Sequence, residues 1–297
     1  MSHPITRRRF LESSVALAFV PSALRGAGEP PRRTAVDQVE LGKTGLRLSR
    51  IGIGTGSRGG SVQRALGREG FEKLVRHAWD RGITYIDTAD SYRMHEWIRD
   101  AVRGLPREKL FIQTKIGGNP ENALAEIDRF RKELGTDYLD SVLVHCAFTS
   151  KWDEERKRVI EGLEEAKSKK LIRAHGASYH SVPALRRAAE LAWIDVNLVR
   201  LNPQGAHIDT GGERWDERSD ASHVPAVVEA LKVLRKTRGG LIGMKILGEG
   251  DFTHREDREK AIRYAVSCGL LDAMAIGFKS SAEIDEAIEL ADRALGK

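Results

Sequence analysis

Short apolar runs alternate with longer amphipathic, charged runs over most of the chain. This alternation is typical of strand-crossover-strand units around a parallel sheet. Eight of the apolar runs predict strands, at residues 51–55, 84–89, 110–115, 141–146, 172–178, 196–202, 241–246 and 273–279. The runs that follow them, such as 67–82 and 153–170, predict helices. Eight strands each followed by a helix favour a closed (β/α)8 barrel, and a doubly wound open sheet with extra units is the alternative.

The chain before the first of these strands divides into three parts. Residues 39–50 predict a β-hairpin whose turn is Lys43-Thr44-Gly45. Residues 29–36 form a proline-rich linker, and residues 37–297 are close in length to the roughly 250 residues of a (β/α)8 barrel. We therefore expect one barrel domain at residues 37–297, which begins with the hairpin, and a separate leader at residues 1–28.

Residues 1–28 carry the pattern of a targeting segment. The order Thr6-Arg7-Arg8-Arg9-Phe10-Leu11 resembles the twin-arginine signal that bacteria use to export folded proteins. The apolar run from Val15 to Val20 is too short to serve as a permanent membrane anchor. The segment predicts an exported protein of the bacterial periplasm whose partner is the twin-arginine export machinery. A disordered basic tail is the alternative.

Charge and cysteine content exclude two classes of partner. The formal charge of +6 falls to +3 once residues 1–28 are removed, so we expect no nucleic-acid partner. Cys146 and Cys268 could pair in an oxidising compartment, but their spacing offers no metal-ligand pattern. We interpret both as small buried hydrophobic residues and predict no metal site.

Polar side chains stand at the carboxyl ends of three consecutive predicted strands, where barrels of this class carry their chemistry. Asp87, Lys115 and His145 are each separated by about one strand-helix unit, and Tyr92 follows Asp87 by five residues. Singly, each has a structural reading as a cap, a solvated cation, a core imidazole or a packed ring. Together they bring a carboxylate, an ammonium, an imidazole and a phenol to one barrel mouth.

Such a set suits proton transfer to a carbonyl oxygen. A phenol with an ordinary pKa of about 10 is a poor donor at neutral pH. A nearby ammonium, held by a carboxylate, is expected to lower that pKa and make Tyr92 a general acid. His145 would orient the same oxygen.

The sequence resembles the aldo-keto reductase superfamily through LGKTGLRLSRIGIGTG, YIDTADSY, LFIQTK and LVHC, in the family's order, over residues 39–290. The resemblance implies a (β/α)8 barrel and a catalytic tetrad of Asp87, Tyr92, Lys115 and His145. It also implies hydride transfer between a nicotinamide, usually of NADP and less often of NAD, and a small carbonyl or alcohol substrate.

The resemblance implies a set of cofactor-binding residues as well, namely Gly54, Thr55, Ser178, Tyr179, Met244, Lys245, Leu247, Gly277, Lys279 and Ser280. Ser178 would hold the nicotinamide amide, with Tyr179 where the family has asparagine. Leu198, or Asn197 on a one-residue slip, stands where the family has glutamine.

Four further cofactor positions depart from the family or allow two readings. Met244 replaces an aromatic platform, and Lys245 is either a phosphate ligand or a solvated lysine. Lys279 and Ser280 favour the adenosine phosphate of NADP, with ordinary helix capping as the alternative, and Glu283 stands near the family's arginine.

The substrate side of the mouth is less defined by the sequence. Few residues follow Ser280, so an open mouth is expected, and the loop at 203–223, with His207 and Trp215, is either a lid or a solvated surface loop. Two other functions remain: a nucleotide-binding sensor without turnover, and an isomerase or lyase without hydride transfer. Export of the folded protein also predicts that NADP binds first and stays bound through turnover.

Overall fold

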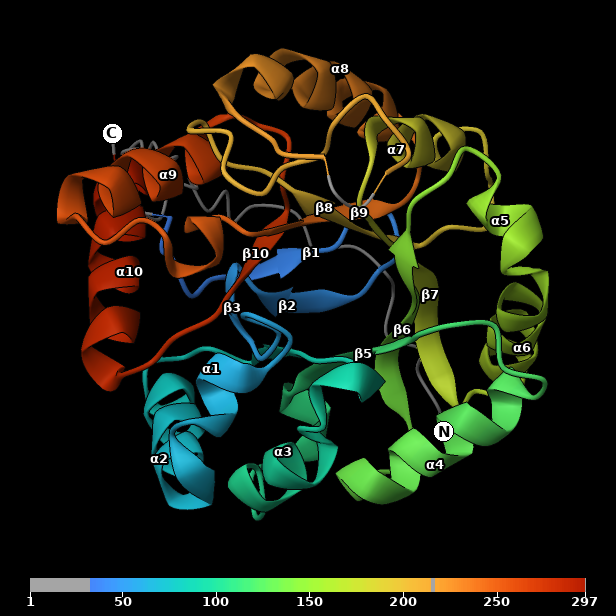
Figure 1. The fold of residues 1–297 in the computed structure, drawn as a ribbon. Coiled ribbons are helices and arrows are strands. Elements are labelled where there is room, and N and C mark those ends of the chain that lie inside the picture. Colours follow the sequence, from blue (N-terminus) through green and yellow to red (C-terminus); the bar gives the residue numbers. More distant parts are fainter. Residues whose placement is uncertain (1–32, 215–216, 297) are drawn as a thin grey trace, which may run out of the picture. The chain divides into compact units, whose positions relative to one another are not determined.

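The computed structural model of the chain describes residues 33–214 and 217–296. The predicted signal segment, the first half of the predicted linker, and Trp215 lie outside these residues. Within them, eight parallel strands close into a barrel in the order in which they follow one another along the chain, with the last strand pairing to the first (Figure 1). The predicted (β/α)8 architecture is confirmed.

The barrel strands are short, four to nine residues in most cases, and lie within or beside the predicted runs. They are β3 (Ile51–Gly54), β4 (Tyr85–Asp87), β5 (Phe111–Ile116), β6 (Leu139–Ala147), β7 (Ile172–Tyr179), β8 (Val196–Arg200), β9 (Gly240–Met244) and β10 (Ala273–Ile276). Closure is made by β10, whose Met274 lies opposite Ile51 on one side and Gly243 on the other.

A ring of amphipathic helices surrounds the strands (Figure 1). The longer helices are α2 (Gly67–Asp80), α3 (His95–Ala101), α4 (Ala123–Leu134), α6 (Lys157–Ser168), α7 (Val182–Ala188), α8 (Val224–Leu234), α9 (Arg255–Ser267) and α10 (Ser281–Leu295). Shorter turns are α1 (Ser61–Arg64), α5 (Trp152–Glu155), η1 (Asp90–Tyr92), η2 (Arg107–Lys109), η3 (Ala221–His223) and η4 (Gly248–Gly250).

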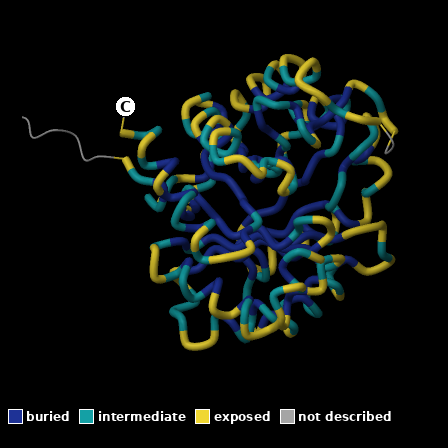
Figure 2. The backbone as a smooth tube through the Cα atoms, turned by 60° about the vertical axis from the view of Figure 1, so that its left-hand side comes forward, coloured by how far each residue is buried: buried dark blue, intermediate teal, exposed yellow. Residues whose placement is uncertain are grey.

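Each long helix turns an apolar stripe toward the strands. In α2 the buried residues are Phe71, Leu74, Val75 and Ala78, the spacing of one helix face. Figure 2 shows the result: buried backbone fills the centre of the domain and exposed backbone gathers on its outer turns. Where α4 and α7 begin, the side chains of Asn122 and Ser181 accept hydrogen bonds from the first-turn amides of Ala125 and Ala184.

The predicted hairpin closes the amino-terminal end of the barrel. Strands β1 (Gln38–Glu40) and β2 (Arg47–Ser49) pair antiparallel, and Leu41, Leu46 and Leu48 pack into the inner layer against Tyr85 and Phe111. The hairpin approaches β9 so closely that a Cβ on Gly240 would lie 2.3 Å from a methyl of Leu41. With its base plugged, the barrel can hold a ligand only at its opposite, carboxyl-terminal end.

None of the helices among the described residues has the length and apolar character needed to cross a bilayer.

Candidate active site

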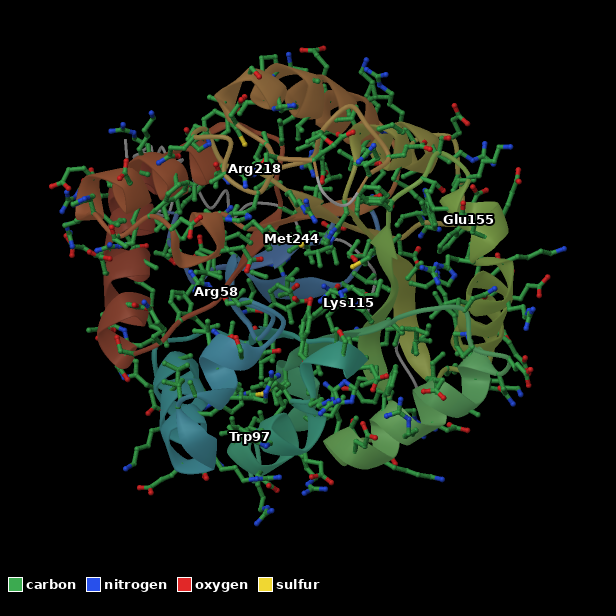
Figure 3. All side chains as sticks on the ribbon, viewed as in Figure 1. Arg58, Trp97, Lys115, Glu155, Arg218 and Met244 are labelled. Carbon is green, nitrogen blue, oxygen red and sulfur yellow. The ribbon has the colours of Figure 1, made fainter. Side chains whose placement is uncertain are left out.

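The carboxyl ends of three neighbouring strands carry three of the four predicted catalytic side chains. Asp87 ends β4, while Lys115 and His145 lie near the ends of β5 and β6. Strand pairing brings them to similar heights, since Asp87 lies opposite Gln113 and Lys115 lies opposite Leu143. In Figure 3, Lys115 and Met244 lie near the centre of the ring, whereas Trp97 and Glu155 lie in its outer part.

Lys115 and Asp87 form a buried ion pair. The Lys115 side chain is 1% exposed, and its ammonium donates to both carboxylate oxygens of Asp87 at 2.8 Å. The same ammonium donates to the carbonyl oxygen of Thr88 at 2.7 Å, and the amide of Gln113 donates to Asp87 at 2.9 Å. These hydrogen bonds offset the cost of burying both charges and fix the ammonium at one point.

Tyr92 lies above this pair. The short η1 turn carries its ring back over the strand ends, where the Lys115 ammonium lies 5.1 Å from the ring centroid. The Tyr92 hydroxyl lies 3.2 Å from Nε2 of His145. Asp87, Tyr92, Lys115 and His145 are therefore brought together as the sequence predicts.

The pKa of Tyr92 moves opposite to the sequence-based expectation. Burial first, and then the charge of Asp87, raise it well above its ordinary value. The pKa of Tyr92 is not lowered as expected because the negative charge of Asp87, in close contact with Lys115, offsets the positive charge of the ammonium. The pKa of His145 is lowered to about 3, chiefly by burial and then by Lys115. At neutral pH the pair is therefore a protonated phenol against an uncharged imidazole.

A cavity of about 660 Å³ opens beside these groups at the carboxyl end of the barrel. Asp87, Tyr92 and His145 form part of its wall. Of the predicted cofactor residues, those that line it are Gly54, Met244, Lys245, Leu247 and Gly277. This is a concave site in which a proton donor, an uncharged imidazole and basic side chains converge.

The aldo/keto reductase family model matches residues 50–290 of this sequence. The chain belongs to the aldo/keto reductase family.

Relatives within this family are distant. A Glycine max protein named "Probable aldo-keto reductase 1" is 29% identical over 177 residues, 51% of each chain. The NADH-specific methylglyoxal reductase of Escherichia coli K12 is 26% identical over 185 residues, 54% of this chain and 57% of the relative. This chain thus spans about half the length of these curated relatives.

A solved structure matches a larger share of the chain. The holo form of an aldo-keto reductase from Bacillus halodurans has a TM-score of 0.68 over 88% of this chain and 95% of its own, at 16% identity. At that identity the likeness shows the fold alone.

Two of the predicted cofactor residues of this aldo/keto reductase are buried behind the cavity wall. The Thr55 amide and hydroxyl both donate to the carbonyl oxygen of Asp87, so Thr55 fixes the backbone of Asp87. Ser178 is 1% exposed and accepts the amide hydrogen of Cys146 at 3.0 Å. Both positions support the wall of the site from behind.

Tyr179 departs from its predicted place at the cofactor. Successive side chains of a strand point to opposite faces, and Ser178 takes the inner face of β7. Tyr179 therefore points outward, where it is fully buried against Trp152 and donates to Asn197 at 2.8 Å. Asn197 is thus directed outward as well, while Leu198 belongs to the inner layer.

Lys279 and Ser280 lie away from the cavity lining and act at the start of α10. The Ser280 hydroxyl accepts the amide hydrogen of Glu283, which is ordinary capping. The Glu283 carboxylate accepts the Lys279 amide hydrogen at 2.7 Å and lies 3.7 Å from the Lys279 ammonium. A carboxylate therefore already occupies the surroundings of the predicted phosphate ligand.

Ionic contacts between loops at the mouth were missed by the sequence analysis. Glu249 accepts from the Lys245 ammonium at 2.8 Å and from the amide of Arg58 at 2.9 Å. Asp251 contacts His207 at 2.8 Å and Arg58 at 3.8 Å. Three loops, after β3, β8 and β9, meet through these acids. The contacts of Arg58 with Glu249 and Asp251, and of His207 with Asp251, join segments far apart in the chain, so no local pattern signals them.

Both cysteines are free and half-buried, which differs from the expectation of buried hydrophobic residues. Cys146 lines the cavity because β6 bulges between Val144 and Ala147, so that Cys146 and its neighbour His145 both reach the mouth.

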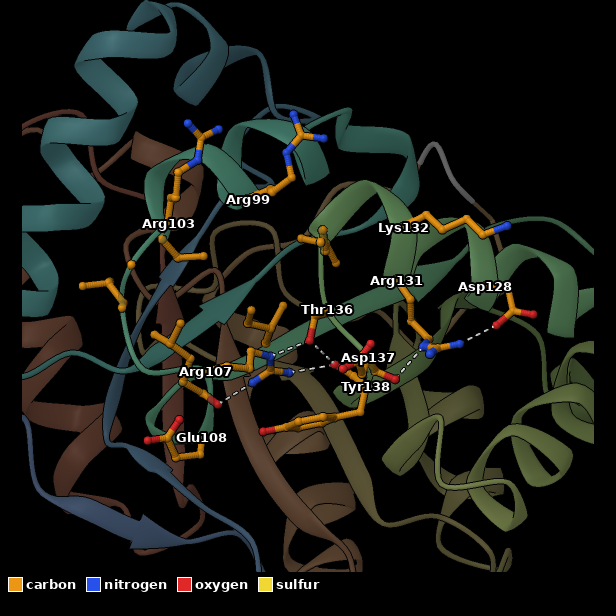
Figure 4. A pocket seen from close by; sticks show the side chains of 17 residues that line it. Arg99, Arg103, Arg107, Glu108, Asp128, Arg131, Lys132, Thr136, Asp137 and Tyr138 are labelled. Atoms are coloured by element: carbon orange, nitrogen blue, oxygen red, sulfur yellow. Dashed lines mark hydrogen bonds and ion pairs between the residues drawn. The ribbon is translucent and has the colours of Figure 1, made fainter.

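A larger hollow, of about 810 Å³, lies at the opposite end of the barrel between α3 and α4 (Figure 4). Its central Arg107 stacks on the ring of Tyr138 at 4.1 Å, donates to Thr136, and pairs with Asp140 at 2.7 Å. These donors are engaged in holding the base of the barrel together.

One cluster outside the mouth has metal-ligand residue types. The ligand atoms of Asp90, His95 and Glu133 lie within 4.8 Å of one another. Arg129, however, lies 3.0 Å from Asp90 and 2.7 Å from Glu133, while His95 contacts Glu133 at 2.7 Å and Thr114 at 2.8 Å. The guanidinium takes the place of a metal cation, so we interpret the cluster as an ion-pair network behind η1.

Gly56 sets the position of the Tyr92 ring, since a Cβ there would lie 2.6 Å from two ring carbons. We expect Gly56→Ala to displace the phenol and to lower kcat of any reaction that uses it by roughly 100-fold, the cost of about 1 Å of misplacement. Steady-state rates measured by nicotinamide absorbance test this. Gly211→Ala is the matched control because its added methyl meets no atom within 4 Å. An unchanged kcat in Gly56→Ala would refute the view that the position of the Tyr92 hydroxyl, as Gly56 sets it, matters for turnover.

Proposed function

We propose that this chain is an NADP-dependent oxidoreductase that transfers a hydride between nicotinamide and a carbonyl or alcohol, with Tyr92 as general acid and base. The observation that carries the proposal is the meeting of the Tyr92 hydroxyl with Nε2 of His145 at 3.2 Å, in a cavity wall backed by the buried Lys115–Asp87 pair. Family membership supports the reaction type.

The residues divide the reaction between them. The bound nicotinamide supplies the hydride. Tyr92 gives its hydroxyl proton to the carbonyl oxygen, and the uncharged imidazole of His145 orients that oxygen by a hydrogen bond. Lys115, fixed by Asp87, stabilises the phenolate that remains. The raised pKa of Tyr92 keeps the phenol protonated at neutral pH, so the proton that carbonyl reduction consumes is in place, and the stabilisation of the phenolate by Lys115 promotes its release.

The lining of the cavity supports the binding of a nicotinamide dinucleotide. Bare backbone at Gly54 and Gly277, the apolar side chains of Met244 and Leu247, and the Lys245 ammonium line one wall. The exposed Lys279 at the start of α10 supports NADP over NAD. Glu283 weakens that preference through its contacts with Lys279, so we expect NAD to be accepted as well.

Tyr92→Phe separates the proposed oxidoreductase from the two alternatives. We expect turnover to fall by roughly 10² to 10⁴ because the proton donor is lost, with nucleotide affinity within about twofold. Rates and nicotinamide fluorescence titrations measure the two quantities. Tyr138→Phe, the same change at the barrel base, should alter neither. Undiminished turnover would contradict Tyr92 as donor. Turnover without nicotinamide would point to an isomerase or lyase.

Glu283→Gln tests the basis of cofactor choice. Glutamine keeps an acceptor for the Lys279 amide but removes the negative charge beside its ammonium. We expect the ratio of Kd for NAD to Kd for NADP to rise by roughly tenfold, which corresponds to about 1.4 kcal/mol. Glu289→Gln, two turns further along α10, is the control. An unchanged ratio would mean that the second phosphate of NADP binds elsewhere.

We propose further that the protein is exported to the bacterial periplasm by the twin-arginine route and carries its nucleotide with it. The support is the order Arg7-Arg8-Arg9-Phe10-Leu11, in residues outside the described structure.

Mass spectrometry of the nucleotide released on denaturing protein from the native periplasmic fraction tests this second proposal. Stoichiometric NADP is the expected result. Protein confined to the cytoplasm, or exported protein without nucleotide, would refute it.

A further inference from the structure

The η1 turn that carries Tyr92 depends on its neighbours for its position. It spans three residues, and the Tyr92 amide donates to the carbonyl oxygen of Ala89 at 3.1 Å. The Arg93 amide donates to the carbonyl oxygen of Asp90 at 3.1 Å, and Arg93 takes a left-handed conformation with a φ of 57°. Residues other than glycine adopt that conformation rarely. A turn this short is not a rigid support by itself, so contacts from the surrounding helices must help to place the phenol.

Arg129 on α4 makes one of these contacts. Its guanidinium lies 3.0 Å from the carboxylate of Asp90, the first residue of η1. The same guanidinium donates to Glu133 at 2.7 Å and to Glu126 at 3.2 Å, and both of these acids belong to α4. Its own helix therefore orients the planar group, and the contact with Asp90 joins that helix to η1.

His95 connects Glu133 to the strand that carries Lys115. The His95 ring is 4% exposed, with Nδ1 at 2.7 Å from Glu133 and Nε2 at 2.8 Å from the Thr114 hydroxyl. Burial lowers the pKa of His95, although Glu133 opposes the shift, so the ring is uncharged at neutral pH. An ionised carboxylate can only accept, which places the hydrogen on Nδ1 and makes Nε2 the acceptor from Thr114. Thr114 directly precedes Lys115 on β5.

A continuous chain of contacts therefore runs from β5 through α3 and α4 to η1. The helices α3 and α4 lie side by side in the ring (Figure 1). At one end the chain holds the strand of Lys115, and at the other it holds the turn of Tyr92. It thus ties together, from outside the barrel, two elements whose catalytic side chains meet inside it.

Arg64 holds the other end of η1. This α1 residue donates to the carbonyl oxygen of Tyr92, and also to that of Gly59 at 3.2 Å. A contact at one point leaves the turn able to rotate about it, whereas a second contact, at the Asp90 carboxylate, fixes its orientation.

The pair of Asp90 and Arg129 is better suited to geometry than to stability. The two side chains are 40% and 41% exposed, and an ion pair at that exposure contributes little to the free energy of unfolding. A misplacement of about 1 Å at a reacting group, in contrast, can lower a rate by roughly 100-fold. Both residues lie outside the cavity wall that the described residues form, so their effect on the reaction has to pass through Tyr92.

We propose that Arg129 is a positioning residue for the general acid. Through Asp90 it holds η1 in the orientation that keeps the Tyr92 hydroxyl 3.2 Å from Nε2 of His145. The inference rests on the proposed reductase function.

Asp90→Ala tests the contact and leaves Arg129 paired with Glu126 and Glu133. We expect kcat for reduction of 4-nitrobenzaldehyde by NADPH to fall roughly 10- to 100-fold, with Kd for NADPH within about twofold and the melting temperature within about 4 °C of the wild type. Asp128→Ala is the matched control, since it removes a carboxylate of similar exposure that pairs with Arg131 inside α4. It should change none of the three quantities.

A double-mutant cycle shows whether the effect passes through the phenol. Where Tyr92→Phe has already removed the hydroxyl, adding Asp90→Ala should lower kcat by less than about twofold. Arg129→Met should lower kcat as far as Asp90→Ala, and the two changes together no further than either alone. Asp90→Asn keeps an acceptor for the guanidinium and should lose less than about fivefold.

The outcomes separate this inference from the proposed function. An unchanged kcat in Asp90→Ala, or an equal loss with and without the Tyr92 hydroxyl, would overturn the positioning role and leave the reductase intact. A wild-type enzyme that reduces neither 4-nitrobenzaldehyde nor a series of simple aldehydes and ketones would overturn both.

Discussion

The buried pair of Lys115 and Asp87 is the interaction on which the site depends. An ammonium that is 1% exposed is stable inside a barrel only with near-ideal partners. It has three acceptor contacts, to both oxygens of Asp87 and to the Thr88 carbonyl. Gln113 and Thr55 in turn fix the carboxylate and its backbone. The pair is therefore a rigid platform, and Tyr92 packs on it.

This platform explains why Tyr92 is protonated. Since Asp87 compensates Lys115 at close range, little net positive charge reaches the phenol, and burial decides its pKa. Burial also holds His145 in its neutral form. At neutral pH the Tyr92 hydroxyl therefore keeps its proton, and Tyr92 and His145 are two uncharged hydrogen-bonding groups at the mouth.

The sequence predicted those features that repeat with the period of the fold. Asp87, Lys115 and His145 could be placed together because each ends a strand one unit after the last. Tyr179 was predicted to lie at the cofactor, but its side chain points away from the interior of the barrel. A shift of one residue along a strand reverses the face that a side chain takes, and the position of Tyr179 in the family's motif did not decide which face that is. The contacts of Arg200 with His180 and of Glu249 with Arg58 join segments that belong to different strand-helix units. Neither periodicity nor local motif carries information on contacts of that kind.

Three cations near the mouth, Lys115, Lys245 and Arg200, each face a carboxylate, but the quality of the pairing differs. Lys115 and Lys245 approach their partners to 2.8 Å. Arg200 and Asp209 stay 3.5 Å apart, with unmade hydrogen bonds on both sides. A well-made pair gains little from a new anion, because the anion must displace a partner already in contact. Of the three pairs, Arg200 with Asp209 is therefore the one that the resting structure satisfies least.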